Sequence, residues 1–232
     1  MSKFYCRTKG NMQVWLDEFA AKGHFWQRML QIAYLMRLRP ETERLLDLPG
    51  LKQRIGFVHP IIGVHVRSGD GCRHGTRAML FHCRSLAEYL PDVRTLATKY
   101  NTTRVYVATD DPQVIADTAK FKDEFTFVFA DEDRSVYRSD AKIEDRMVQR
   151  RMPVDQHAVM TSTLRDIFLL AEGDYLVTHQ ASAMSRLALQ IATERHKAVP
   201  PYISLDGPYC PDWKMCCGVT MGEHGKVTNG LA

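Results

Sequence analysis

The chain has 232 residues, which at about 100–200 residues per domain corresponds to one large domain or two small ones. Hydrophobic residues make up 45% and charged residues 25%, values that exclude collagen and intrinsic disorder for the bulk of the sequence. The 31 Lys and Arg against 27 Asp and Glu leave a net charge of +4, too mild and too evenly mixed for a nucleic-acid-binding protein. We therefore expect no nucleic-acid partner.

Targeting signals are scarce in the sequence. No run of about eighteen apolar residues occurs, so no transmembrane helix is predicted. The N-terminus lacks the apolar core of a signal peptide, and no secretion or anchoring device is visible in this chain. The six cysteines include no Cys-x-x-Cys pair and permit disulfides without requiring them. Asn101-Thr102-Thr103 is an N-glycosylation sequon, which points toward the secretory pathway.

Helices are expected at the start of the chain. Apolar residues recur at helical spacing from 12 to 38, with Gly23 as a break and Pro40 just beyond the end. A second helix is expected over 41–53, beginning in the sequence PETERLLDL. Together these elements predict an N-terminal helical segment over residues 1–55.

From residue 61 the pattern changes to short apolar runs that alternate with helical stretches. The runs, rich in Val, Ile, Phe and Tyr, suit strands buried on both faces of a parallel sheet: 61–66, 104–109, 125–130, 175–178 and, more weakly, 202–205. The helical stretches are 85–100 (with Pro91 as an alternative helix start), 112–119, 158–172 and 182–195. This alternation predicts an α/β fold, a doubly wound, Rossmann-like parallel sheet over residues 56–206.

Two stretches are predicted to be irregular. Residues 131–157 are long and charged, and we expect an excursion near the ligand-binding edge of the sheet. The tail, residues 207–232, clusters Gly, Pro and Cys and is expected to be loop.

Ligands of open α/β sheets bind outside the carboxyl ends of the strands, so the residues after each run are the informative ones. His65 and Arg67 close the first strand on one face, because strand side chains alternate. An Arg there presents a planar fork that matches phosphate oxygens. The alternative is a structural salt bridge between Arg67 and Asp70.

Two further strand ends carry polar residues. Asp110 and Asp111 follow the second strand, where one should cap the helix that Pro112 opens and the other should face the cleft. Ser182 follows the fourth strand at an N-cap position. The helix it opens would offer free N–H groups and a positive dipole to a phosphate.

The carboxylate of Asp166 lies among apolar residues of the helix before the fourth strand. It is either a solvated or capping group, or a cleft residue that accepts two donors from a guanine edge.

Two metal hypotheses are weaker. Asp131-Glu132-Asp133 is similar to an Asp-x-Asp metal clamp, although most such triplets are exposed loops. The other set matches no standard zinc spacing and comprises Cys72, His74, His82 and Cys83.

Three blocks of the sequence carry a family resemblance. FWQRMLQIAYLMRLRPETERLL with IGFVHPIIGVHVRSGD, then RVYVATDDP, then TLRDIFLLAEGDYLVTHQASAMSRLALQIA resemble the α-1,6-fucosyltransferases that modify N-glycan cores. The blocks occur in the family's order and cover roughly residues 24–195. His-Val-Arg followed by Asp, combined with Ala-Thr-Asp-Asp, is specific. Peptide O-fucosyltransferases and bacterial nodulation fucosyltransferases share weaker versions of it.

The resemblance implies a GT-B-like fold, of which this chain would hold the C-terminal, nucleotide-binding half. It implies GDP-fucose as donor, inversion at the sugar carbon, no metal and no other cofactor, a glycan or glycoprotein acceptor, and the Golgi as location. Carried over position by position, the resemblance places His65 and Asp166 at guanine, Arg67 at the β-phosphate and Ser182 near that phosphate. Asp70 matches an acidic residue of the family's first motif, and Asp110 and Asp111 match the acidic pair of its second motif.

The sequence departs from the family at two positions that bear on catalysis. A second arginine of the first motif is Ser68 here, and the glutamate implicated as general base is Arg77. We therefore expect Asp70 to be the base, with His74 as the alternative on the same loop. The relatives also have a further domain before the helix at 24. A peptide O-fucosyltransferase-like enzyme and a non-catalytic GDP-sugar-binding remnant are the alternative functions.

Overall fold

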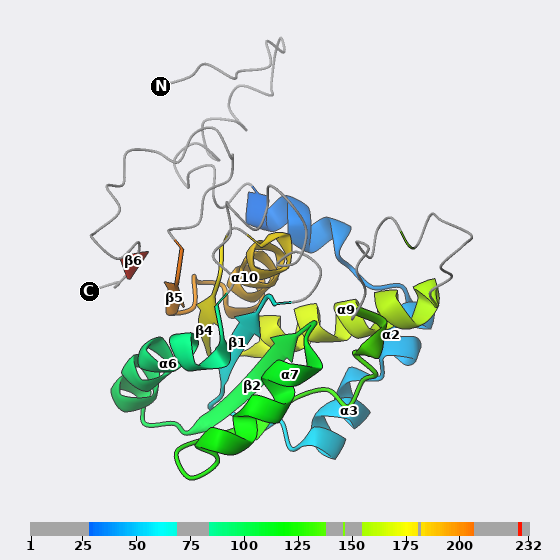
Figure 1. Cartoon of the computed structure of the whole chain (residues 1–232). Helices are drawn as coiled ribbons and strands as arrows, with labels where there is room; N and C mark the ends of the chain where they lie inside the picture. The colour runs from blue at the N-terminus through cyan, green and yellow to red at the C-terminus, as the bar shows by residue number, and fades with distance from the viewer. Residues whose placement is uncertain are drawn as a thin grey trace, which may run out of the picture.

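The computed structural model describes residues 28–68, 84–137, 146, 155–180, 182–206 and 227–228. Its centre is a six-stranded sheet in the order β3-β2-β1-β4-β5-β6 (Figure 1). The first five strands are parallel and β6 pairs antiparallel with β5. The bounds of the strands are β1 Ile62–Val66, β2 Arg104–Thr109, β3 Thr126–Val128, β4 Tyr175–Thr178, β5 Tyr202–Ser204 and β6 Val227–Thr228.

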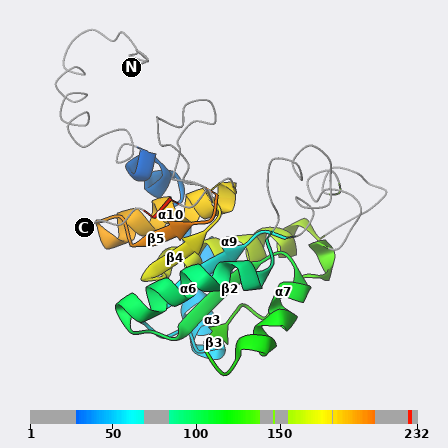
Figure 2. The same cartoon turned by 60° about the vertical axis from the view of Figure 1, so that its left-hand side comes forward.

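Helices cover both faces of this sheet, as a doubly wound fold requires (Figures 1 and 2). On one face α6 (Leu86–Tyr100) and α7 (Pro112–Asp117) connect β1 to β2 and β2 to β3. On the other face α9 (Gln156–Glu172) and α10 (Ala183–His196) lead into and out of β4. The strand order reverses between β1 and β4, so the carboxyl ends of these two strands flank the topological switch point. The predicted fold class is confirmed.

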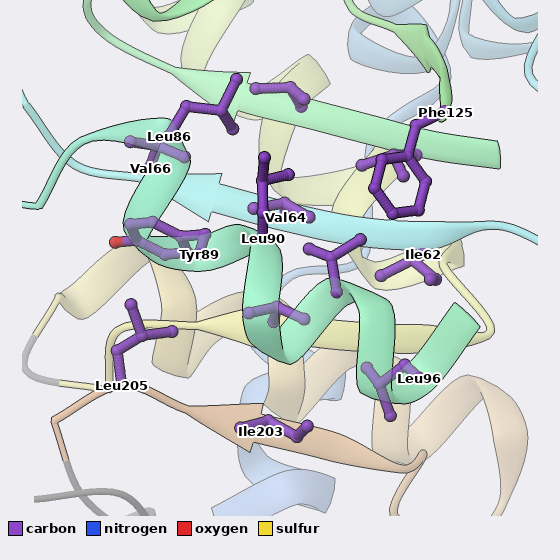
Figure 3. Packing of buried hydrophobic residues seen from close by; sticks show 14 of the residues in the cluster. Ile62, Val64, Val66, Leu86, Tyr89, Leu90, Leu96, Phe125, Ile203 and Leu205 are labelled. Atoms are coloured by element: carbon purple, nitrogen blue, oxygen red, sulfur yellow. The ribbon is translucent and has the colours of Figure 1, made fainter. Parts of the chain in front are cut away.

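The alternation of strand side chains divides the core into two layers. Ile62, Val64 and Val66 of β1 face α6, whose Leu86 and Leu90 pack over them (Figure 3). On the opposite face, Ile61 and the β2 residues Tyr106 and Ala108 pack with Leu169 and Leu170 of α9. Since both faces of β1 and β2 are buried, their sequences read as continuous apolar runs.

The N-terminal helices differ from the prediction. Residues 28–35 are helical, which agrees with part of the helix expected over 12–38. The helix expected over 41–53 is instead two helices, α2 (Pro40–Leu46) and α3 (Leu48–Ile55). Asp47 lies between the two helices, with its backbone in the left-handed conformation at φ 43°. Its side chain caps α3 by accepting from Gly50 N–H at 3.2 Å. A continuous helix would place Pro49 in its interior, where the ring clashes with a backbone carbonyl.

Smaller corrections follow from local chemistry. The helix α6 runs unbroken through Pro91, so Pro91 does not begin a new helix. The helix α9 starts two residues earlier than expected because Asp155 accepts from His157 N–H and Ala158 N–H. The edge strand β3 is only three residues long, and the 3₁₀ helix η1 (Thr118–Phe121) follows α7 directly.

The two irregular stretches are described only in part. Within 131–157 the described residues include the 3₁₀ helix η2 (Ser135–Tyr137). The tail for which only loop is expected contains the short strand β6. Across the described residues, no helix is both long and apolar enough to cross a membrane.

Candidate functional site

The carboxyl ends of β1, β2 and β4 bring most of the predicted site residues to one edge of the sheet. His65 and Arg67 come from β1 and its end, Asp110 and Asp111 follow β2, and Ser182 precedes α10 after β4. Asp166 approaches from α9. The remaining predicted residues, Asp70 and His74, and the family position at Arg77 lie outside the described residues.

Arg67 is held by the acidic pair of β2. Its guanidinium forms an ion pair with Asp110, whose Oδ1 also accepts from Ser68 N–H at 3.0 Å. The structure therefore shows Asp110 as a partner of Arg67, where the sequence suggested Asp70. The Arg67 side chain keeps 32% of its surface exposed, so the guanidinium is oriented and still accessible. The residue that departs from the family, Ser68, helps to fix the turn because its Oγ donates to Asp111 at 3.1 Å.

The prediction that one residue of the acidic pair caps the helix opened by Pro112 is confirmed. Asp111 is the N-cap of α7 and accepts from Gln113 N–H at 2.8 Å. Its neighbour Asp110 does not cap the helix but faces Arg67. The end of β1, the end of β2 and the start of α7 are thereby joined in one polar network.

His65 is buried with only 2% of its surface exposed, and its Nδ1 lies 2.6 Å from Ser185 Oγ of α10. Burial, with Arg67 and His179 adding to it, lowers the pKa of His65 to about 3. The ring is therefore neutral at physiological pH. Ser185 Oγ also accepts from His179 N–H at 3.4 Å, so one hydroxyl of α10 links the ends of β1 and β4.

Asp166 is neither solvated nor a cap, so that alternative is wrong. It is 5% exposed, and its Oδ1 accepts from the Tyr106 hydroxyl of β2 at 2.5 Å. Burial raises the pKa of Asp166 to about 6, against the lowering effects of Arg134 and the Tyr106 hydrogen bond. The carboxylate is mostly ionised at neutral pH, although the fold disfavours its charge.

Helix α10 begins where a phosphate site is expected. Ser182 is its N-cap, with extended backbone, and makes no side-chain capping bond. The first turn also contains Arg186, whose Nη1 donates to Gln180 O at 2.9 Å. Arg186 is not among the residues predicted from the sequence, although its place in the first turn after a strand could be read there.

A second polar cluster joins the ends of β4 and β5. Asp206 accepts from Gln180 N–H and from Ser204 Oγ, both at 2.7 Å, and its Oδ2 lies 3.3 Å from His179 Nδ1. None of the site residues predicted from the sequence belongs to this cluster. It fixes the turn that leads from β4 toward Ser182.

Two residues of the acidic triplet after β3 have separate partners. Glu132 Oε1 lies 2.6 Å from Arg165 Nη1, and Asp133 accepts from Ser135 N–H at 2.8 Å. Of the two aspartates of the Asp-x-Asp hypothesis, Asp133 is thus engaged by a backbone N–H, and no group of three or more potential metal ligands occurs among the described residues. The residues of the zinc hypothesis lie outside the described parts of the chain.

Arg134 is the most unexpected residue of this edge. It follows the triplet in a charged stretch, yet only 5% of its surface is exposed. Its Nε donates to Thr109 O at 3.0 Å, at the end of β2. Nothing in the sequence pattern separates this buried arginine from its solvated neighbours.

A family model and a curated relative both match this chain, and both are α-(1,6)-fucosyltransferases. Residues 13–210 match the family model described as α-(1,6)-fucosyltransferase N- and catalytic domains. An α-(1,6)-fucosyltransferase of Drosophila melanogaster is 31% identical over 188 residues, which cover 77% of this chain and 27% of the fly protein. The chain thus spans about a quarter of the length of that relative.

Solved structures of two fucosyltransferases also align with the chain. NodZ α-1,6-fucosyltransferase soaked with GDP-fucose is 21% identical, with 73% of this chain and 46% of NodZ covered and a TM-score of 0.40. POFUT1 in complex with GDP is 11% identical, with 68% and 46% covered and a TM-score of 0.42.

Proposed function

Because the chain belongs to the α-(1,6)-fucosyltransferase family, we propose that it binds GDP-fucose and transfers fucose to a glycan, with N-glycan core-type α-1,6 linkage and inversion. The chain spans 27% of the fly relative, and we propose that this part holds the donor. The observation that carries it is the placement of Arg67, oriented by Asp110, at the switch point beside the start of α10.

This edge suits a diphosphate leaving group. Breaking the fucose–phosphate bond leaves negative charge on GDP. Arg67 is accessible there and can form charge-assisted hydrogen bonds to phosphate oxygens. The N-terminal N–H groups and dipole of α10 add positive potential beside it. A site that meets the developing charge with fixed donors stabilises the transition state, and in our proposal it does so without a metal ion.

The guanine base is proposed to lie next to Asp166. A carboxylate can accept from both N1–H and the amino group of guanine, whereas adenine has no such pair of donors. Asp166 keeps acceptor capacity because each carboxylate oxygen has two lone pairs and Tyr106 uses one of them. His65 is proposed to contact the base or the sugar through Nε2, since its Nδ1 is engaged by Ser185 Oγ.

The acceptor hydroxyl must lose a proton, and two buried groups of the described site do not suit that role. His65 has a pKa of about 3, too low for a base that must hold a proton near neutral pH. Asp166 is buried against Tyr106. We therefore keep Asp70 as the proposed base, with His74 as the alternative.

Donor turnover is the test of this function. Incubation of the full chain with GDP-fucose and a core-type N-glycan should produce fucosylated glycan and free GDP, and excess EDTA should leave the rate unchanged. Fucosylation of a folded peptide domain, with no product on the glycan, would favour the peptide O-fucosyltransferase alternative. Tight GDP binding without transfer or hydrolysis would identify a non-catalytic GDP-sugar-binding remnant. By family resemblance we expect the activity in the Golgi.

A further inference from the structure

We infer that Arg134 is a second base-reading residue: its Nη2 donates to O6 of the guanine whose N1–H and amino group are bound by Asp166. The inference rests on the proposed function and extends it, because none of the family positions carried over from the sequence includes Arg134.

The contacts of Arg134 leave one donor group unused. Nε donates to Thr109 O at 3.0 Å and Nη1 to Glu132 O at 3.2 Å. The third nitrogen, Nη2, is buried and has no hydrogen-bond partner among the described residues. Both acceptors are neutral backbone carbonyls. They fix the orientation of the guanidinium but do not neutralise its charge.

An orphaned donor of this kind is costly. A buried polar group without a partner costs about 1–3 kcal/mol, and more when the group is charged. Buried polar atoms in native proteins are nearly always satisfied, so a specific exception calls for an explanation such as a ligand or an ordered water. The neighbouring Arg165 provides the contrast, since its Nε, Nη1 and Nη2 donate to Leu46 O, Glu132 and Leu45 O.

The surroundings of Arg134 identify the ligand atom. Burial raises the pKa of the Asp166 carboxyl and of the Tyr106 hydroxyl, and the positive charge of Arg134 opposes that rise in both. The contacts of the guanidinium place it between the elements that carry this pair. Its Nε donates to Thr109 O, three residues after Tyr106 on β2. Its Nη1 donates to the backbone of Glu132, whose carboxylate binds Arg165, the residue before Asp166 on α9. The proposed phosphate site lies one strand further, between β1 and β4, so Arg134 is on the base side of the nucleotide.

Guanine presents complementary atoms at this place. O6 is an acceptor directly beside the N1–H donor, so a carboxylate and an adjacent cationic donor together match that edge of the base. In DNA recognition, arginine bound to guanine O6 and N7 is the commonest specific contact, so a guanidinium donor and O6 are matched chemically. Adenine has an amino group where guanine has O6, so Arg134 would add to discrimination against adenine.

The test compares GDP with 6-thio-GDP, which keeps N1–H and the amino group but replaces O6 with the weaker acceptor sulfur. Calorimetric titration of the wild-type chain should give a preference for GDP of about tenfold, equivalent to about 1.4 kcal/mol. Arg134→Met should reduce this ratio to about one while GDP remains preferred over ADP through Asp166. Arg165→Gln, the matched control, should keep the wild-type ratio.

The ratio is measured on the folded fraction alone, so partial destabilisation of a variant does not alter it. If Arg134→Met does not fold, Arg134→Lys replaces it and should give an intermediate ratio. A wild-type chain without preference between the two nucleotides, or a substituted chain with the full wild-type ratio, overturns the inference. Failure of the wild-type chain to bind GDP at all would instead overturn the proposed function.

Discussion

The ionised carboxylate of Asp166 lowers the stability of the fold, and the same ionised form is the one proposed to bind guanine. Its pKa of about 6 in the folded chain lies above the ordinary value of 3.8. The contribution of this group to stability is therefore fully present below about pH 3.8 and is lost as pH rises through 6, after which it stays constant. Above that range the fold holds a buried carboxylate at a cost on the order of 2–3 kcal/mol.

Asp166→Asn should remove this cost. We expect the variant to be more stable than the wild type at pH 8 and to lose that advantage near pH 4, because asparagine can still accept from the Tyr106 hydroxyl. Urea denaturation at the two pH values measures the difference. A variant less stable than the wild type at pH 8 would show that the ionised carboxylate is stabilised in the fold.

The same carboxylate predicts a pH dependence of nucleotide binding. Acceptance from both guanine donors needs the ionised form, so GDP affinity should fall as pH drops below about 6. Since the phosphates of GDP titrate in the same range, ADP serves as the reference nucleotide. The GDP-to-ADP affinity ratio should collapse at low pH in the wild type and be low at every pH in Asp166→Asn. A ratio independent of pH in the wild type would argue against Asp166 as the guanine acceptor.

Among the elements, β1 and α9 approach each other closely because Gly63 has no side chain. A Cβ at this position would lie 2.9 Å from Leu176 Cδ2 and 3.2 Å from Leu170 Cδ2. Both leucines are fully buried, so their side chains have little room to move. Gly63→Ala should therefore destabilise the chain by about 1–3 kcal/mol, measured as a lower urea midpoint with an unchanged slope. An unchanged midpoint would mean that the layer between β1 and α9 tolerates the extra methyl group.

The strands that are buried on both faces of the sheet could be predicted from the sequence. The runs 104–109 and 175–178 are strands with the predicted bounds, because burial on both faces leaves an uninterrupted apolar signal. The break at Asp47 differs from the predicted single helix, although Pro49 near the start of α3 is a local signal for it. In the candidate site, the position of Arg67 at the end of β1 and the capping by Asp111 could be predicted, because strand ends and caps are marked in the local sequence.

Arg134 and the Tyr106–Asp166 hydrogen bond depend on tertiary contacts instead. The residues of that bond are 60 positions apart in the sequence, and the phenol is brought under α9 only when the sheet is assembled. The arginine sits in an acidic, polar stretch that has the composition of solvent-exposed loop. Its burial follows from the bond to Thr109 O and could not be predicted from spacing or composition.

At the scale of the whole molecule, the sequon is remote from the candidate site. Asn101 is exposed at the C-cap of α6, beside the amino end of β2, whereas the site lies at the carboxyl ends of the strands. Expression through a secretory pathway should give a glycosylated chain whose mobility shift is removed by an endoglycosidase.

Asn101→Asp is the matched substitution for this prediction, since aspartate also tolerates the left-handed conformation at φ 51°. It should abolish the shift and leave GDP affinity unchanged. Loss of GDP binding on glycosylation would place the glycan, and hence this end of the sheet, closer to the ligand than the fold implies.

The central claim concerns the carboxyl edge of the sheet as a GDP site organised around Arg67. Its most direct test is calorimetric titration of GDP into the wild-type chain, Arg67→Ala and Arg67→Lys. A charge-assisted contact to phosphate is worth about 1.5–3 kcal/mol, so Arg67→Ala should weaken binding by about 10- to 100-fold. Lysine should restore part of it, because it keeps the charge without the planar fork. A GDP affinity in Arg67→Ala equal to that of the wild type would contradict the account.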